Sequence, residues 1–397
     1  MEVVVTGIGL VSALGDSLEA SWQRLISGKS GIGLYQPFPE LTPKPLALIG
    51  KQPEQLKTLT KLVVELALKD AGLVPPMPDC GVVIGSSRSY QASWEQLARQ
   101  RFLAKNIAPI HSDGAVEQEL EHWLDTLPHM NAIASARQIG SQAIVLAPMA
   151  ACATGIWAIA QGSYLVRTGQ CQRVIVGAVE AAITPLTLAG FNQMGALAKT
   201  GAYPFDQYRE GLVLGEGAAV FVLESAELAK SRSAAVYGQV LDFGLTSDAY
   251  HAIAPELGGR SALIAVKQCL DRSNLRTTDI DYIHAHGTAT QLNDRHEAQI
   301  IQQLFPQGVP VSSTKGATGH TLGASGAIGV AFCLMALQNQ VLPPCVGLKS
   351  PEFDLDLVAE PRRGNIQRVL CFSFGFGGQN AAIALKKSDQ CNVASGK

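Results

Sequence analysis

The sequence predicts an α/β protein built from two similar halves. Short apolar runs of strand type alternate with helical patterns along the chain, and this alternation predicts sheets covered by helices. The alternation forms two blocks that break near residues 230–235. The chain has 397 residues, of which 47% are hydrophobic and 16% charged. This composition is typical of a protein with a large buried core.

The expected strands divide evenly between the two halves. They are 3–8, 81–86, 143–148, 173–179 and 218–224 in the first, and 235–244, 281–287, 309–316, 368–375 and 381–387 in the second. Helical patterns lie between them, such as 56–72, which ends at Gly72, and 261–275. We therefore expect an N-terminal half at 1–232 and a C-terminal half at 233–397. Residues 86–142 have little strand character, and we interpret them as an excursion from the core that forms a cap or an oligomer surface.

Charge and hydropathy exclude several classes of protein. The net charge of −2 implies no nucleic-acid partner. The start MEVVVTGIGL predicts a strand and not a signal peptide. No charged residue lies between Arg137 and Arg167, a length that could span a bilayer. Because this stretch contains Pro148 and several small or polar residues, we expect a buried strand followed by a buried helix, and no membrane span.

The cysteines are scattered and lack metal-binding spacing. They occupy positions 80, 152, 171, 269, 333, 345, 371 and 391. None forms a C-x-x-C pair, so a zinc site has no support, and the pattern is typical of an intracellular protein with reduced thiols. No glycine-rich run fits a nucleotide-binding motif: GIGLVSALG has Ser12 at the third glycine position, and a strand is expected after GFGG.

Cys152 stands at an expected strand-to-helix turn, before a helical pattern that reaches about Gly169. N–H groups at a helix start would lower the pKa of a thiol and could bind an oxyanion on an attached acyl group. The alternative is that Cys152 is a small buried hydrophobic residue. We interpret the other seven cysteines in that second way.

Three histidines and a lysine lie in small-residue turns. His284 and His286 are two residues apart at a strand end, and a metal site would need His296, which falls in a helical pattern, as a third ligand. We therefore predict no metal. Lys315 and His320 lie in an otherwise uncharged, glycine-rich stretch, where burying them is costly without a purpose. A structural role for His320 remains open from the residues alone.

Five ordered motifs identify a family resemblance. They are AACATG (150–155), YPFDQYREGLVLGEGA (203–218), HAHGTAT (284–290), KGATGHTLGASG (315–326) and SFGFGGQN (373–380). In this order and spacing they resemble the β-ketoacyl-[acyl-carrier-protein] synthases of the thiolase superfamily, in particular the type II condensing enzyme of fatty-acid synthesis. The resemblance covers nearly the whole chain and is weakest across 86–142.

The resemblance implies a fold, a reaction and partners. The fold would be the five-layered αβαβα thiolase fold, in a cytoplasmic homodimer, or a plastid one in a eukaryote. The enzyme would be an acyltransferase that condenses an acyl thioester with malonyl on acyl carrier protein, with loss of CO2, to give a β-ketoacyl product in fatty-acid elongation. Neither a metal nor another cofactor would be needed.

The resemblance also implies residue roles. Cys152 resembles the acyl-accepting nucleophile, His286 and His320 the pair that handles malonyl decarboxylation, and Lys315 the nearby structural or electrostatic lysine. Phe376 resembles the gating residue whose N–H joins that of Cys152 in the oxyanion hole. Thr288 and Thr290 resemble the residues whose hydroxyls contact the phosphopantetheine arm. Trp157, one helical turn after the nucleophile, either lines the acyl tunnel or packs in the core.

The chain departs from the family pattern at several positions. The family often has a glutamate that pairs with the lysine, where this chain has Gly329, so Lys315 needs another partner, such as Glu216 or Glu297, or remains unpaired. The other departures are His284 before A-H-G, which we interpret as structural, Gln379 for the usual threonine, and Glu210 for the usual aspartate.

Three alternatives remain open. The same chemistry could serve a polyketide or specialised-lipid pathway, because residues 86–142 differ from the common pattern. A thiolase would need a second catalytic cysteine, and Cys371 is the candidate, although it is not in the C-x-G pattern of thiolases. A non-catalytic, chain-length-factor-like partner typically lacks the cysteine that this chain has at position 152.

Overall fold

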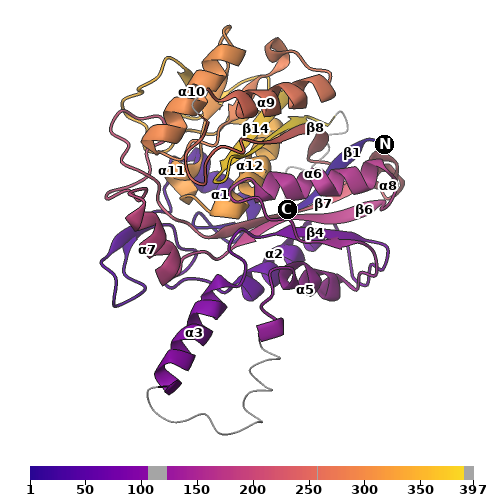
Figure 1. The fold of residues 1–397 in the computed structure, drawn as a ribbon. Helices are drawn as coiled ribbons and strands as arrows, with labels where there is room; N and C mark the ends of the chain where they lie inside the picture. Colours follow the sequence, from indigo (N-terminus) through magenta and orange to yellow (C-terminus); the bar gives the residue numbers. More distant parts are fainter. Residues whose placement is uncertain (106–122, 257, 389–397) are drawn as a thin grey trace.

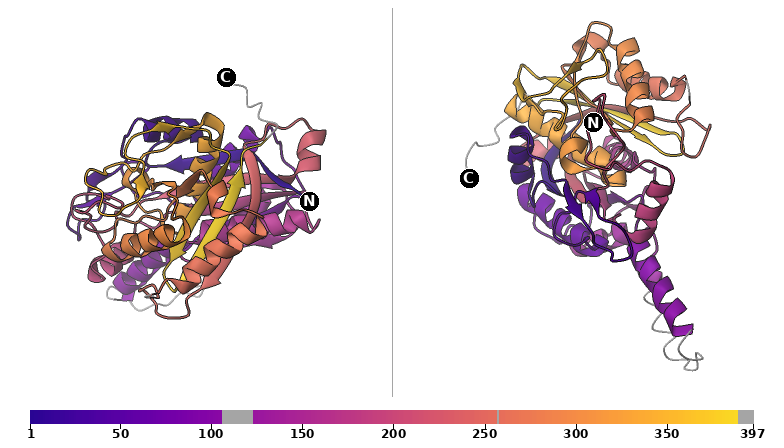
Figure 2. Two further views of the ribbon diagram at one scale, coloured as in Figure 1. Left: turned by 90° about the horizontal axis from the view of Figure 1, so that it is seen from above. Right: turned by 90° about the vertical axis from the view of Figure 1, so that its left-hand side faces the viewer.

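The computed structural model describes residues 1–105, 123–256 and 258–388 and shows two blocks of strands with helices around and between them (Figures 1 and 2). The first block has the order β1-β7-β6-β4-β5 and the second β8-β15-β14-β9-β10-β12. The strands are β1 (Val3–Ser12), β4 (Gly81–Gly85), β5 (Val145–Leu146), β6 (Arg173–Glu180), β7 (Gly217–Ser225), β8 (Gly238–Ser247), β9 (Tyr282–His284), β10 (Pro310–Ser312), β12 (Asp356–Leu357), β14 (Arg368–Gly375) and β15 (Gln379–Lys386).

The two blocks repeat one pairing scheme. In the first, β1, β7 and β6 pair antiparallel, and β6, β4 and β5 continue in parallel. In the second, β8, β15 and β14 pair antiparallel, and β14, β9 and β10 continue in parallel. A short antiparallel pairing of Val3–Val5 with Gly238–Val240 joins the blocks. The expectation of two similar halves is confirmed, and the exact division at 232/233 stays a proposal.

Helices form three layers around the two blocks. Helices α2 (Leu56–Asp70) and α5 (Met130–Ile139) cover the outer face of the first block, and α9 (Arg260–Arg272) and α10 (Gln291–Leu304) cover that of the second. Between the blocks lie α6 (Thr154–Arg167) and α12 (Ser325–Asn339), which contact strands of both. This arrangement is the five-layered αβαβα fold that the resemblance implied.

The central layer explains the long apolar stretches. The uncharged stretch from Arg137 to Arg167 folds as the end of α5, strand β5 and helix α6. The helix is buried as expected, whereas the edge strand β5 is only half-buried. The segment Leu322–Asn339 is also long and apolar enough to cross a membrane, but 89% of it is buried inside the protein. Helix α12 is apolar on all sides because it packs between two sheets.

The predicted excursion at 86–142 is narrower than expected. Helix α3 (Gln91–Lys105) runs away from the body of the protein (Figures 1 and 2). In contrast, α5 packs on α2 and β4 and buries Ala132, Ala136 and Ile139, so it belongs to an outer layer of the core. Residues 106–122 of the predicted excursion lie outside the described residues.

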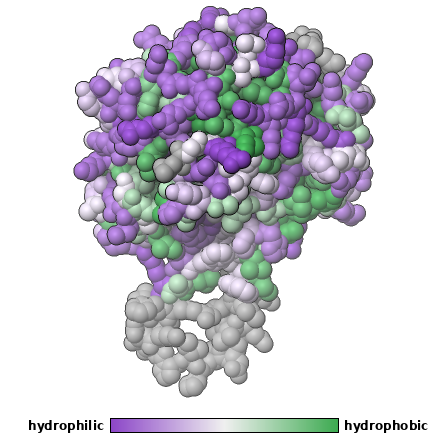
Figure 3. Space-filling view, turned by 45° about the horizontal axis from the view of Figure 1, so that its top comes forward, coloured by the Kyte–Doolittle hydropathy of each residue, from purple (hydrophilic) through white to green (hydrophobic). Residues whose placement is uncertain are grey.

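The remaining elements are short or peripheral. They are α1 (Leu18–Ile26), β2 (Gly33–Tyr35), β3 (Lys44–Leu46), α7 (Pro185–Gln193), α8 (Ala226–Ser231), α11 (Lys315–Thr318), β11 (Val341–Leu342), β13 (Arg362–Arg363) and two 3-10 turns at Thr277–Asp279 and Leu322–Ala324. Most of the face in Figure 3 is hydrophilic, and apolar residues show between the polar ones near its centre.

The topology places the sequence motifs together. Cys152 follows β5, His286 follows β9, Lys315 and His320 follow β10, and Phe376 follows β14. All four strands run in the parallel part of their block. The carboxyl ends of parallel strands are the usual location of functional loops in α/β proteins, so the fold itself brings these motifs to one region.

Candidate active site

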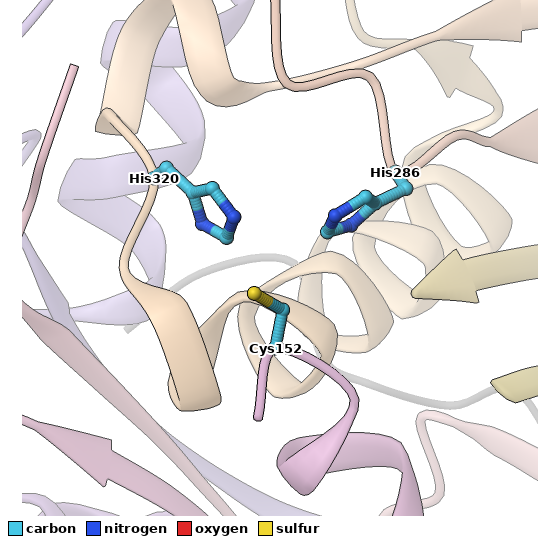
Figure 4. Close-up of side chains that lie close together, drawn as sticks. All are labelled: Cys152, His286 and His320. Atoms are coloured by element: carbon cyan, nitrogen blue, oxygen red, sulfur yellow. The ribbon is translucent and has the colours of Figure 1, made fainter. Parts of the chain in front are cut away.

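Cys152, His286 and His320 converge on one point, although 168 residues separate the first from the last (Figure 4). The cysteine sulfur and a ring nitrogen of each histidine lie within 4.8 Å of one another. The two imidazole rings are 5.3 Å apart and nearly perpendicular, at 82°. All three side chains are buried.

Backbone geometry at the start of α6 positions the thiol. Ala151 has a φ of 47°, a conformation that non-glycine residues rarely adopt, and it turns the chain sharply before Cys152. The hydroxyl of Thr154 fixes this turn, since it accepts a hydrogen bond from the N–H of Ala150 at 2.9 Å. The Ser373 hydroxyl donates to the Cys152 carbonyl at 2.8 Å. The backbone N–H of Phe376 lowers the pKa of the Cys152 thiol, so it acts on the sulfur.

The thiol of Cys152 does not have the low pKa that a helix start suggests. Burial raises its pKa to about 11, and this outweighs the lowering by the charge of Lys315 and by the N–H of Phe376. The expectation of a low pKa was wrong for this thiol, because its deep burial opposes the lowering of the pKa by the helix start. At neutral pH the group is a thiol that must lose its proton during acyl transfer.

His320 is held as one tautomer. Its Nδ1 accepts a hydrogen bond from the N–H of Leu322 at 3.2 Å and lies 2.9 Å from the hydroxyl oxygen of Ser325. A nitrogen that accepts from an N–H carries no proton itself, so the proton of the neutral ring is on Nε2. Burial, together with the charge of Lys315, holds the pKa of His320 well below its usual value. The ring is therefore a neutral N–H donor.

His286 is held through its backbone and its Nδ1. The carboxylate of Glu297 accepts hydrogen bonds from the N–H groups of His286 at 2.6 Å and Gly287 at 2.7 Å. The ammonium of Lys315 donates to the carbonyl of His286 and lies 3.4 Å from its Nδ1. Because an ammonium can only donate, Nε2 carries the proton of this ring as well. Burial and then the Lys315 charge hold the pKa of His286 well below its usual value.

Neither proposed carboxylate forms an ion pair with Lys315. Glu216 instead accepts from the N–H groups of Ile49 and Glu54. Glu297 acts on Lys315 through its charge, with its oxygens bound to the backbone beside His286. Within the described ranges, no carboxylate lies in salt-bridge distance of the ammonium.

A cavity of about 270 Å³ opens onto the three side chains. Thr288, Thr290 and Phe376 line it. The hydroxyls of Thr288 and Thr290 are 2.9 Å apart, and that of Thr290 also caps α10. Much of the remaining wall is apolar and includes Phe191, Leu212, Ile253, Leu292 and Phe374.

The other singled-out residues lie apart from the catalytic group. Trp157 packs against the main core cluster and is not part of the cavity wall, which favours the core-packing alternative. His296 lines the cavity, but neither it nor His284 belongs to the Cys152 group. Cys371 is buried and does not line the cavity, which weakens the thiolase alternative.

The Cys–His–His group has donor atoms of types that bind metals. The hydrogen bonds do not favour that use. An imidazole binds a metal through a nitrogen without a proton, whereas Nδ1 partners place the proton of both rings on Nε2. The chemistry of the donor set therefore fits N–H donation to an oxyanion better than metal ligation.

Sequence reasoning missed how the catalytic loops are held, although it named Glu297 as a possible partner of Lys315. Asp294 and Glu297, one turn apart on α10, bind backbone N–H groups of the loop that carries His286. Their i, i+3 spacing shortly after the HAHGTAT motif places both carboxylates on one face of a helix, and this pattern could have identified them. The carboxylate of Glu180 binds the N–H of Gly323, near His320, and the hydroxyls of Ser86 and Ser87. No local pattern identified that carboxylate.

Comparison with known proteins gives the same assignment. Residues 51–229 match the beta-ketoacyl synthase N-terminal domain, and residues 237–349 match the C-terminal domain of that family. A putative mitochondrial 3-oxoacyl-[acyl-carrier-protein] synthase of Schizosaccharomyces pombe is 32% identical over 97% of this chain and 99% of its own. A 3-oxoacyl-[acyl-carrier-protein] synthase 2 of Synechocystis is 33% identical over 97% and 98%.

Polyketide enzymes are similarly related. The tetracenomycin polyketide synthase ketoacyl synthase alpha subunit of Streptomyces glaucescens is 32% identical over 97% of each chain. The solved structure of the ishigamide ketosynthase/chain length factor is 25% identical and covers 98% of this chain and 99% of that one, with a TM-score of 0.89. The fold, the five motifs and these matches show that the chain belongs to the β-ketoacyl synthase family and is a condensing enzyme.

Proposed function

We propose that the protein condenses an acyl thioester with malonyl on acyl carrier protein in fatty-acid chain elongation. The observation that carries this proposal is the meeting of the Cys152 thiol with two imidazole N–H donors in one buried group. Relatives named 3-oxoacyl-[acyl-carrier-protein] synthase support the carrier protein as partner. The apolar cavity wall suits a saturated acyl chain.

The first half-reaction loads the enzyme. The sulfur of Cys152 attacks the thioester carbonyl, and the backbone N–H groups of Cys152 and Phe376 stabilise the tetrahedral oxygen. The carbonyl carbon keeps its acyl chain and loses the pantetheine sulfur. The proton of Cys152, which burial holds on the thiol, leaves with that sulfur. The products are the acyl-cysteine and the free pantetheine thiol.

The second half-reaction forms the carbon–carbon bond. Malonyl thioester loses CO2, and the electrons of the broken bond form an enolate with charge on the thioester oxygen. The Nε2–H groups of His286 and His320 donate to this oxygen, a role that needs neutral rings. The enolate carbon attacks the acyl-cysteine carbonyl, and the thiolate of Cys152 leaves and takes a proton from water. At other oxyanion sites one such donor contributes about 2.7–4 kcal/mol.

Lys315, Thr288 and Thr290 have supporting roles in this proposal. Lys315 holds His286 through its carbonyl and Nδ1. The two threonine hydroxyls line the cavity, where they can bind the amide groups of the phosphopantetheine arm. Phe376 stacks on Phe191 with ring centroids 5.9 Å apart, so a movement of this pair would open or close the cavity.

A polyketide or specialised-lipid pathway is the second candidate. The relative named as a tetracenomycin ketoacyl synthase alpha subunit favours it, since its identity equals that of the fatty-acid relatives. Acylation of the purified protein distinguishes the two candidates. The protein is incubated with saturated acyl carriers of graded length and, separately, with poly-β-ketone mimics of equal length. Intact mass should show a saturated acyl adduct on Cys152. A preference for the ketone mimics would instead support the second candidate function. If no donor formed an adduct on Cys152, the protein would be a non-catalytic partner.

We further propose a cytoplasmic homodimer. Strand β5 is the edge of its sheet block and pairs only with β4 among the described strands, so its outer edge can receive a second copy. Light scattering coupled to size-exclusion chromatography should give twice the mass of the chain. Fractionation of cells that express the protein tests the compartment.

A further inference from the structure

Glu180 is a fully buried carboxylate at the end of strand β6. Its oxygens accept five hydrogen bonds, all from uncharged groups. The donors are the hydroxyl of Ser86 at 2.9 Å, the N–H and the hydroxyl of Ser87 at 2.8 and 2.6 Å, the N–H of Arg88 at 3.1 Å and the N–H of Gly323 at 3.0 Å. Burying a carboxylate is costly even when hydrogen bonds compensate it, so this arrangement needs an explanation other than core packing.

The donors to Glu180 come from both halves of the protein. Residues 86–88 directly follow β4 in the first strand block, whereas Gly323 lies in the turn after α11, beyond β10 of the second block. A Cβ atom added at Gly323 would lie 2.5 Å from a carboxylate oxygen of Glu180 and 2.8 Å from the backbone nitrogen of Ser87. Only glycine allows the turn to approach this closely. The carboxylate therefore connects the turn to the loop after β4.

This turn also determines which nitrogen of His320 carries the proton. The N–H of Leu322 reaches Nδ1 of the ring at 3.2 Å because Leu322 has a φ of 42°. At the other end of the turn, the backbone of His320 is fixed by two hydrogen bonds with residues 213–215. Gly323 directly follows Leu322, so the hydrogen bond to Glu180 holds the peptide next to the N–H that orients the ring.

We propose that Glu180 is a positioning residue for His320: its carboxylate holds the turn, so that the N–H of Leu322 stays on Nδ1 and Nε2 keeps the proton that it donates. Glu180 does not line the cavity, so it acts through the turn and does not touch the substrate. The expected effect on decarboxylation rests on the proposed function, whereas the tautomer of the ring does not.

The first experiment measures the tautomer of His320 and uses no substrate. It is nitrogen NMR of protein with isotopically labelled histidine, in which the signals of His320 are identified by their loss in His320→Gln. The wild-type ring should show a protonated Nε2 and an unprotonated Nδ1. In Glu180→Ala the two signals should move toward each other, because both tautomers become populated. Identical signals in the wild type and in Glu180→Ala would overturn the proposal.

The second experiment compares the two half-reactions in Glu180→Ala. Decarboxylation of malonyl carrier protein should fall about tenfold, the scale of one lost hydrogen bond to a charged group. Acylation of Cys152 should equal or exceed the wild-type rate, because burial above all, and also the charge of Glu180, raise the pKa of that thiol. A loss of folded protein would slow both reactions by the same factor. An equal decrease in both would therefore show that Glu180 is only structural.

A conservative variant and a matched control refine this comparison. In Glu180→Gln the amide oxygen can still accept from Gly323, so decarboxylation should lie between the rates of Glu180→Ala and the wild type. Glu224 is an equally buried carboxylate near the end of β7, and it does not line the cavity. Glu224→Gln should lower stability without changing the ratio of the two half-reactions. A changed ratio in Glu224→Gln would show that the loss of any buried carboxylate has this effect, and would overturn the specific role of Glu180.

A reciprocal variant keeps the test valid if Glu180→Ala does not fold. Gly323→Ala retains the carboxylate but places a methyl group against it, so it should also slow decarboxylation more than acylation. Where both variants fold, the effect of Gly323→Ala should be smaller in the Glu180→Ala background, because the carboxylate that the methyl group meets is gone. An unchanged ratio in Gly323→Ala would overturn the proposal. Wild-type protein that neither acylates nor decarboxylates would instead contradict the proposed function, and the NMR signals would still report the tautomer.

Discussion

Nδ1 of His320 accepts a hydrogen bond from the backbone N–H of Leu322, two residues further along the chain. Leu322 has a φ of 42°, so the chain turns sharply enough for this N–H to reach back to the ring. The tautomer of the histidine is thus determined by the turn that carries it. A rigid donor of this kind is what stabilisation of a developing oxyanion requires.

Replacing His320 by Ala should therefore slow malonyl decarboxylation. The loss of one oxyanion donor predicts a decrease of ~10²-fold or more. Release of CO2 from malonyl carrier protein measures it. Ser325→Ala is the matched control, since it removes the hydroxyl near Nδ1 but leaves the Leu322 N–H, so its effect should be much smaller. An unchanged rate in the His320 variant would return this histidine to a structural role.

Removal of the thiol should separate the two half-reactions. Cys152→Ala should abolish condensation, because no acyl chain can be held on the enzyme. Decarboxylation should continue, since both imidazoles remain. Product formation from acyl and malonyl carriers measures the first reaction, and CO2 release measures the second. Condensation at the normal rate in this variant would show that Cys152 is not the nucleophile.

Much of this fold is predictable from local sequence, and the reasons for the exceptions are physical. Strands such as β6 and β14 are visible because both of their faces are buried, which produces continuous apolar runs. Helix α5 was misplaced because its neighbours α2 and β4 lie far away in sequence. An outer-layer helix shows only an amphipathic pattern, and that pattern does not identify what it covers.

The candidate site, like the fold, could be predicted from the sequence only in part. Motif order was sufficient to identify Cys152, His286 and His320, and the fold brings them together. The pKa of Cys152 was not predictable, because it depends on how deeply a loop is buried and not on the loop sequence. The contact of Lys315 was equally hidden, since its side chain donates to the carbonyl of His286, which lies in a separate segment.

Alkylation of Cys152 should depend strongly on pH. With a pKa of about 11, the thiolate fraction rises about tenfold for each pH unit between 7 and 9, and the thiolate is the reactive form. The rate of modification by iodoacetamide, measured at Cys152 by peptide mass spectrometry, should follow that slope. Cys371 supplies an internal control, because burial denies it reagent at every pH in this range. A rate at Cys152 that is already constant from pH 6 upwards would contradict the raised pKa.

Close packing between β1 and α2, and between β8 and α9, should limit substitution at equivalent glycines of the two halves. A Cβ added to Gly9 would lie 2.1 Å from the carbonyl oxygen of Val63, and one added to Gly244 would lie 1.8 Å from that of Ala265. In each case the first strand of a half packs through backbone against an outer-layer helix, and backbone cannot move aside easily. Gly9→Ala and Gly244→Ala should each lower the free energy of unfolding by about 1–3 kcal/mol, the usual cost of overpacking.

Thermal and denaturant unfolding would measure this cost, with Gly364→Ala as the matched control. An added Cβ at Gly364 meets no atom within 4 Å, so this variant should unfold like the wild type. If the two halves are packed alike, the Gly9 and Gly244 variants should lose similar stability, and their effects should add in the double variant because the two sites have separate neighbours. A neutral result at one glycine and a large loss at the other would show that the shared strand order does not extend to equivalent packing.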